Sequence, residues 1–171
     1  GTVSPSNIIL IGFMGCGKST VGHLLATDLS YSFTDTDMLI EEKEKRTIRE
    51  IFSQEGENYF RMCENAIMSE YIGSLNPVVI STGGGLPLFV DNLSEKGFVV
   101  YLSLPFHAIV ERLSSQEREN RPLFHNLEEA EKLYIAREPF YKKSADFVVD
   151  ATQKTEEIVE KIKEAYASRS S

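Results

Sequence analysis

A glycine-rich segment near the start of the chain has the residue types that hold phosphate groups. Residues 12–20 read Gly-Phe-Met-Gly-Cys-Gly-Lys-Ser-Thr, which fits the phosphate-loop pattern Gly-x-x-x-x-Gly-Lys-Ser/Thr. Glycines let backbone N–H groups point at phosphate oxygens without interference from a Cβ atom. We expect Lys18 to contact the β- and γ-phosphates of a nucleoside triphosphate and the Ser19 hydroxyl to bind Mg²⁺. The residues predicted to contact the nucleotide are Gly15, Cys16, Gly17, Lys18, Ser19 and Thr20.

A pair of carboxylates, Asp35 and Asp37, follows a segment at 31–35 that is typical of a strand. Mg²⁺ prefers oxygen ligands and keeps much of its hydration shell, so we expect Asp35 to hold this ion, partly through water. Asp37 could accept the proton of an attacking hydroxyl, which would make it a catalytic base together with the catalytic Lys18. The alternative is that the pair only caps a helix.

Two arginines, Arg61 and Arg137, lie on predicted helices and outside any run of basic residues. Arginine binds carboxylates through two parallel hydrogen bonds. Beside the backbone of Gly83, Gly84 and Gly85, they would select a small carboxylated acceptor. The three glycines follow a strand, which indicates either close approach of another group or positive φ angles, although a plain tight turn is an alternative. Either arginine alone could also form a surface salt bridge.

Residues 114–126 are polar, charged and without periodicity, a pattern typical of a mobile lid. We expect Arg121 in this segment to close over the phosphates as a third catalytic residue. Closure would exclude water, which otherwise competes for the phosphoryl group.

Short apolar runs alternate with helical patterns along the chain, which predicts an α/β fold with a five-stranded parallel sheet covered by helices on both faces. The predicted strands are 8–11, 31–35, 77–81, 97–102 and 147–150. The predicted helical stretches are 21–26, 38–45, 47–55, 59–72, 88–96, 105–113, 127–141 and 155–167. Ligands bind at the carboxyl ends of such strands, where the phosphate loop, the aspartates and the glycines all fall.

Composition limits the classes of protein and partner. The 171 residues include 42% hydrophobic and 26% charged residues, as expected for one globular domain spanning 1–171. The net charge of −8 argues against nucleic-acid binding, which needs a basic surface. The sequence contains no apolar run long enough to span a membrane. The two cysteines, Cys16 and Cys63, form no spacing pattern, so we expect a cytoplasmic protein, and we expect a monomer.

These residues resemble those of the shikimate kinases over nearly the full chain. The shared residues are Gly12–Thr20, Asp35-Thr36-Asp37, Gly56-Glu57, Phe60-Arg61 with Glu64, Gly83–Gly85, Arg121-Pro122-Leu123 and Arg137-x-Pro-x-Tyr141. The resemblance implies a P-loop kinase fold similar to that of nucleoside monophosphate kinases. It also implies ATP-dependent phosphorylation of the 3-hydroxyl of shikimate in aromatic amino-acid biosynthesis.

The resemblance also implies roles for individual residues. The residues that would bind shikimate are Asp37, Arg61, Gly83, Gly84, Gly85 and Arg137. The helical region at about 36–73 would be the substrate-binding part of the domain. Glu64 would orient Arg61 or a substrate-bound water. Arg112, on the helix before the lid, resembles the residue that stacks on adenine.

Two other functions remain as alternatives. One is a different small-molecule kinase, such as a gluconate or nucleoside monophosphate kinase, although the aspartates and arginines suit a carboxylate that bears a hydroxyl. The other is a noncatalytic nucleotide-binding switch, but the Asn-Lys-x-Asp motif expected of a GTPase is not in the sequence.

Overall fold

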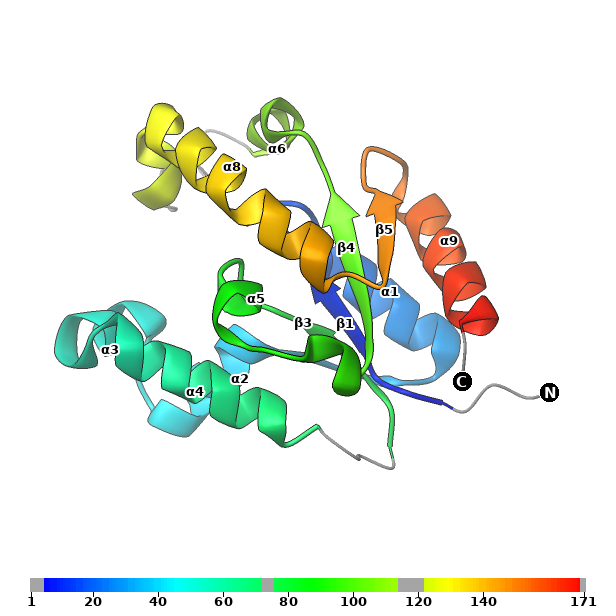
Figure 1. The fold of residues 1–171 in the computed structure, drawn as a ribbon, viewed down its shortest axis with the longest axis horizontal. Helices are drawn as coiled ribbons and strands as arrows, with labels where there is room; N and C mark the ends of the chain where they lie inside the picture. Colours follow the sequence, from blue (N-terminus) through cyan, green and yellow to red (C-terminus); the bar gives the residue numbers. More distant parts are fainter. Residues whose placement is uncertain (1–4, 72–75, 114–121, 170–171) are drawn as a thin grey trace.

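The computed structural model describes residues 5–71, 76–113 and 122–169. These residues form a five-stranded sheet with the strand order β2-β3-β1-β4-β5. All four strand pairs are parallel, and the arrowheads of β4 and β5 point the same way in Figure 1. The strands are β1 (Ile8–Ile11), β2 (Ser32–Asp35), β3 (Val78–Ser81), β4 (Phe98–Ser103) and β5 (Phe147–Asp150). The predicted parallel sheet is confirmed.

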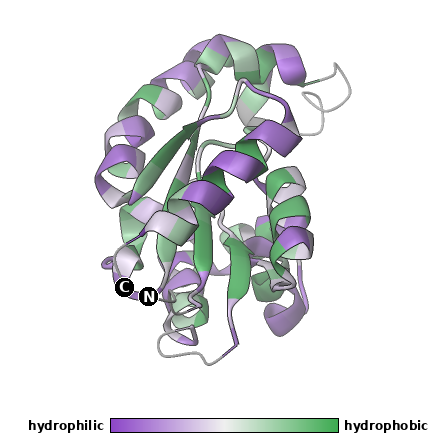
Figure 2. Cartoon of the chain, turned by 90° about the vertical axis from the view of Figure 1, so that its right-hand side faces the viewer, coloured by the Kyte–Doolittle hydropathy of each residue, from purple (hydrophilic) through white to green (hydrophobic). Residues whose placement is uncertain are grey.

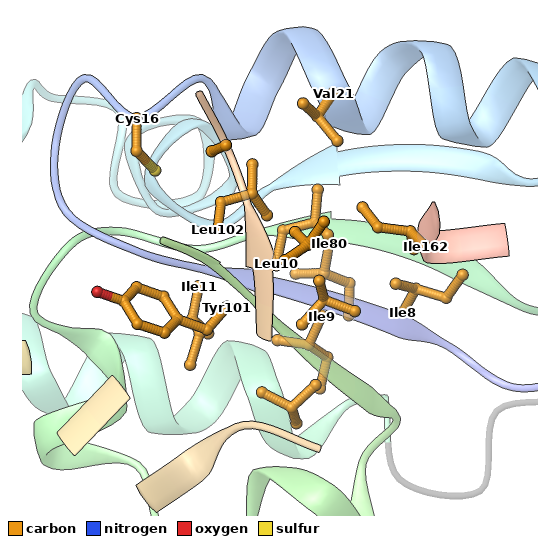
Figure 3. Packing of buried hydrophobic residues seen from close by; sticks show 14 of the residues in the cluster. Ile8, Ile9, Leu10, Ile11, Cys16, Val21, Ile80, Tyr101, Leu102 and Ile162 are labelled. Carbon is orange, nitrogen blue, oxygen red and sulfur yellow. The ribbon is translucent and has the colours of Figure 1, made fainter. Parts of the chain in front are cut away.

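The central strand β1 is apolar at every position because both of its faces are covered. Each residue from Ile8 to Ile11 is fully buried. Figure 3 shows Leu10 on the side of Val21 and Ile11 beside Tyr101 on the other side. Alternate side chains of a strand point to opposite faces, so a continuous apolar run is what a doubly covered strand requires.

Helices cover both faces of the sheet. On one face α1 (Lys18–Leu29) packs against α9 (Thr155–Ser168), and on the other α8 (Leu127–Ser144) packs against β4. The other helical elements are α2 (Thr36–Glu44), α3 (Ile48–Glu55), α4 (Glu57–Ser69), α5 (Leu86–Phe89), α6 (Phe106–Arg112) and the 3-10 turns Leu93–Glu95 and Pro122–His125. Figure 2 shows hydrophobic strands enclosed by helices with mixed hydrophilic surfaces. Among these described helices, none is long and apolar enough to cross a membrane.

The helices α2, α3 and α4 lie together at one side of the sheet, at the left of Figure 1. They share a small hydrophobic cluster of their own, separate from the main core. Its buried members are Ile40, Ile51, Phe60 and Ile67. Thr47 begins α3 with a capping box, in which its hydroxyl accepts from the N–H of Glu50 and the Glu50 carboxylate accepts from the N–H of Thr47.

Three local predictions need correction. The helix predicted at 88–96 is wrong, because the extended Val90 ends α5 and Asn92 has a left-handed backbone with a φ angle of 57°. Pro105 precedes α6 as its N-cap instead of lying in its first turn. Within the predicted lid, residues 122–125 form a 3-10 turn, while residues 114–121, including Arg121, lie outside the described residues.

Candidate active site

A cavity of about 500 Å³ opens at the carboxyl edge of the sheet. Its walls come from the phosphate loop, the ends of β2 and β3, the end of α6 and the start of α9. The lining residues are 14–21, Asp35, Asp37, 81–84, Arg112, Leu113 and Thr155. The topology thus brings the phosphate loop, both aspartates and two of the three glycines to one place.

The phosphate loop has the shape and the donors to hold an anion. Gly15 and Gly17 have φ angles of 85° and 94°, which non-glycine residues rarely adopt. Helix α1 begins directly after Gly17, with no side-chain cap and no acidic residue in its first turn. Its first N–H groups therefore need acceptors from outside the helix, and the helix dipole favours a negative charge there. Lys18 Nζ lies across the loop, 2.6 Å from the carbonyl oxygen of Gly12.

The donors that could hold Mg²⁺ are oxygen atoms of Ser19 and Asp35, and both residues line the cavity. One carboxylate oxygen of Asp35 accepts a hydrogen bond from the N–H of Met38 at 3.1 Å and so caps α2. The cap uses one carboxylate oxygen and leaves the second for a cation. Asp35 can therefore cap α2 and hold Mg²⁺ at the same time. The described residues contain no group of three or more His, Cys, Asp and Glu that could hold a metal. A hydroxyl and one carboxylate fit Mg²⁺, whose remaining ligands are commonly water and phosphate oxygens.

Asp37 lies in the first turn of α2 and faces the glycine segment. A Cβ atom at Gly83 would come within 2.8 Å of Asp37 Oδ1. This oxygen is buried and has no hydrogen-bond partner among the described residues. Burial, assisted by the negative charge of Asp35, raises the pKa of Asp37 to about 6, although Lys18 and Arg61 oppose the shift. A buried carboxylate oxygen without a donor is suited to accept a hydrogen bond from a bound hydroxyl.

Arg61 forms an ion pair with Glu64, one turn further along α4. Nη1 of Arg61 lies 2.7 Å from Oε1 of Glu64, whose side chain is fully buried. Burial raises the pKa of Glu64 to about 7, despite the opposing effect of the Arg61 charge. The spacing of three residues places both side chains on one side of α4.

The glycines 83–85 provide room for the charged side chains around them. A Cβ atom at Gly84 would lie 3.1 Å from Nη1 of Arg137, and one at Gly85 would lie 2.7 Å from Nη2 of Arg61 and 3.1 Å from Nη2 of Arg137. Both guanidinium groups therefore meet at Gly85. None of the three glycines has a positive φ angle. Close approach, and not an unusual backbone conformation, is what requires glycine here.

Tyr141 fixes the glycine segment from the opposite side. It lies one turn after Arg137 on α8, is fully buried, and donates its hydroxyl proton to the carbonyl oxygen of Gly84 at 2.6 Å. Burial raises its pKa further above the ordinary value, so the hydroxyl remains a donor. One turn of α8 thus supplies a guanidinium to the site and holds the backbone beside it.

A family model described as shikimate kinase matches residues 14–167 of the chain. This chain belongs to the shikimate kinase family. A shikimate kinase from Helicobacter hepaticus is 38% identical over 156 residues, which cover 91% of this chain and 93% of that protein. A shikimate kinase from Persephonella marina is 42% identical over 139 residues, or 79% of this chain and 83% of that protein.

Solved structures agree with the family match. A shikimate kinase from Acinetobacter baumannii in complex with shikimate has a TM-score of 0.81 at 33% identity and covers 94% of this chain and 92% of that one. A shikimate kinase from Aquifex aeolicus has a TM-score of 0.80 at 38% identity, with coverages of 93% and 95%. A gluconokinase from Sinorhizobium meliloti shares 21% identity at a TM-score of 0.59 and therefore shares the fold alone. The predicted P-loop kinase fold and the predicted enzyme class, a kinase, are confirmed.

Three further residues lie near the site but do not belong to the cluster of Asp37, Arg61 and Arg137. Arg112 donates from Nη1 to the carbonyl oxygen of Cys16 at 3.3 Å, so it lies against the phosphate loop at the cavity wall. Thr155, at the start of α9, lines the same cavity and had no predicted role. Sequence reasoning also missed Phe89, which contacts Arg61. No pattern in the sequence pointed to either residue.

Proposed function

We propose that this chain transfers the γ-phosphoryl group of ATP to the 3-hydroxyl of shikimate, a reaction of aromatic amino-acid biosynthesis. The observation that carries the proposal is the meeting of Asp37, Arg61 and Arg137 around the glycine segment, beside the phosphate loop. Membership of the shikimate kinase family supports it. A relative with the same fold was solved with shikimate bound.

On the nucleotide side, the chain would hold ATP through the amides and side chains of residues 15–20. Lys18 would contact the β- and γ-phosphates, and Arg112 would lie against the adenine. Ser19 and Asp35 would hold Mg²⁺, which would neutralise negative charge on the phosphates. We keep Arg121 as a proposed catalytic residue of the lid; it lies outside the described residues.

On the acceptor side, Arg61 and Arg137 would bind the carboxylate of shikimate together with the N–H of Gly84. Gly83 and Gly85 would allow the acceptor and the arginines to approach the backbone. Binding of the carboxylate in this way would place a hydroxyl group of the acceptor between Asp37 and the γ-phosphate.

Asp37 would accept the proton of that hydroxyl while the hydroxyl oxygen forms a bond to the γ-phosphorus. The bond between the γ-phosphorus and the β,γ-bridging oxygen would break, which releases ADP. A pKa of about 6 leaves most Asp37 side chains ionised at neutral pH and still gives a useful base. Positioning and charge neutralisation supply most of the catalysis in phosphoryl transfer.

We also propose that residues 1–171 act as one kinase domain, in which the region at 36–73 binds the acceptor and 114–126 acts as the lid. The separate hydrophobic cluster of α2, α3 and α4 supports a distinct acceptor-binding region. Free Cys16 and Cys63 are compatible with a cytoplasmic location. The net charge of −8 favours small molecules over nucleic acid as partners. A monomeric state remains a proposal that sedimentation can check.

The test is a coupled assay for ADP with Mg²⁺ and ATP, in which shikimate, quinate and gluconate are compared at equal concentrations. We expect shikimate to have the highest kcat/KM. The variant Lys18→Ala, prepared in the same way, controls for contaminating kinases and should show little turnover. A preference for gluconate, or tight ATP binding without turnover of any acceptor, would contradict the proposal.

A further inference from the structure

Phe89, the last residue of α5, is a large aromatic side chain that the proposed chemistry does not use. Its side chain remains 42% exposed. Its ring nevertheless lies against Arg61, with the guanidinium carbon 4.2 Å from the ring centroid. This distance is typical of a cation–π contact, in which the face of the ring attracts the positive charge.

The hydrogen bonds of Arg61 fix only one edge of its guanidinium group. Nη1 donates to Glu64 Oε1 at 2.7 Å, whereas the buried Nε has no hydrogen-bond partner among the described residues. Nε also lies 3.7 Å from Oε1 of Glu57, an exposed carboxylate on the preceding turn of α4. The rings of Phe89 and, at 5.3 Å, Phe60 contact the guanidinium and add to what holds its orientation.

The backbone of Phe89 is tied to the same turn of α4 that carries Arg61. The side-chain amide of Asn65 donates to the carbonyl oxygen of Phe89 at 3.0 Å and to that of Arg61 at 3.0 Å. The ring is therefore held in register with the guanidinium by a polar bridge between α4 and α5. Because Phe89 is exposed, its ring contributes more to the contact with Arg61 than to the hydrophobic core.

We propose that Phe89 is a positioning residue for the acceptor. It keeps the guanidinium of Arg61 against Gly85, in the orientation that meets the acceptor carboxylate. This inference rests on the proposed function of Arg61. It implies that Phe89 affects binding of the carboxylated acceptor and leaves nucleotide binding unchanged, because its contact is with Arg61 and not with the phosphate loop.

The test compares the variants Phe89→Ala, Phe89→Leu and Phe89→Tyr with the parent protein. Phe140→Ala is the matched control, since Phe140 is a phenylalanine of α8 with 45% exposure that does not line the cavity. We expect Phe89→Ala to raise the KM and the Kd for shikimate about 5- to 30-fold, with kcat and the KM for ATP changed less than about twofold. Phe89→Tyr, which keeps the aromatic face, should restore binding, and Phe89→Leu should not.

Calorimetric titration with shikimate gives the Kd independently of turnover, and thermal unfolding checks that each variant folds. Unchanged shikimate binding in Phe89→Ala, or full binding in Phe89→Leu, would overturn the inference. Equal losses for shikimate and ATP would also overturn it, because they would indicate a general structural effect. If the parent protein does not phosphorylate shikimate, the proposed function fails. If the parent protein phosphorylates shikimate and Phe89→Ala binds shikimate equally well, only the inference about Phe89 fails.

Discussion

Replacing Arg61 by alanine separates the contribution of this residue to binding from its contribution to stability. The side chain is 13% exposed and is paired at 2.7 Å with Glu64, which is fully buried. Loss of one partner of a buried ion pair commonly costs about 3–5 kcal/mol, because the remaining charge is left without compensation. Glu64 can avoid this cost by taking up a proton.

The pKa of Glu64 determines how large the loss of stability is. Burial already raises this pKa to about 7 in the presence of Arg61. Near pH 7 the carboxyl group is therefore about half protonated, and completing its protonation costs less than about 1 kcal/mol. We expect Arg61→Ala to lower the free energy of unfolding at pH 7 by about 1 kcal/mol through this charge effect.

The pH dependence of this stability follows from the sign of the shift. The pKa of Glu64 in the folded protein lies above its ordinary value of 4.5, so the folded state binds the proton more tightly than the unfolded state. The contribution of this group to stability therefore rises as the pH falls from above 7 towards 4.5. Urea unfolding at pH 5.5 and pH 7.5 measures this contribution as a difference in the free energy of unfolding. Glu64→Gln should reduce that difference.

Binding of the acceptor should respond much more strongly than stability. Removal of a guanidinium from a buried charge pair with a ligand carboxylate costs about 2–4 kcal/mol, which raises the Kd for shikimate about 30- to 1000-fold. Calorimetric titration measures this Kd, and titration with ADP is the control that should change little. An unchanged Kd for shikimate would remove Arg61 from the site. A stability loss of 3–5 kcal/mol would show instead that Arg61 keeps Glu64 charged.

Three further perturbations test other residues of the site. Asp37→Asn should lower kcat about 10²- to 10⁴-fold in the coupled assay, with the KM for ATP nearly unchanged, and the parent protein should lose kcat as the pH falls through about 6; near-normal turnover of the variant would refute the assignment of the base. Tyr141→Phe leaves the carbonyl of Gly84 without its donor and should raise the KM for shikimate several-fold, about 1 kcal/mol in binding; a changed KM for ATP alone would argue against this. Alkylation of the buried Cys16 should block ATP binding, and ADP should protect it; equal labelling with and without ADP, measured by mass spectrometry, would count against its place in the nucleotide site.

The sheet and the phosphate loop could be predicted because their signals are local. A continuous apolar run at Ile8–Ile11 is compatible with few structures other than a strand buried on both faces. The glycine pattern that follows it matches a loop whose backbone needs positive φ angles at Gly15 and Gly17. The alternation of strands and helices then places the ends of β1, β2 and β3 at one edge, where the aspartates and glycines lie.

Features that depend on tertiary contacts could not be predicted in the same way. The glycines 83–85 left close approach and positive φ as alternatives. Their φ angles and the positions of Asp37, Arg61 and Arg137 decide for close approach. The contact of Phe89 with Arg61 joins α5 to α4 and has no periodic signal. The break between α5 and the following 3-10 turn depends on the extended backbone of Val90 and the left-handed backbone of Asn92.

The proposed reaction depends most on how the acceptor lies between the arginines and Asp37. The most direct measurement is a crystal structure of the chain with shikimate, ADP and Mg²⁺. We predict that the shikimate carboxylate contacts Arg61 and Arg137 and that the 3-hydroxyl oxygen lies about 2.6–3.2 Å from a carboxylate oxygen of Asp37. Shikimate bound with its carboxylate away from both arginines, or with another hydroxyl at Asp37, would contradict the account.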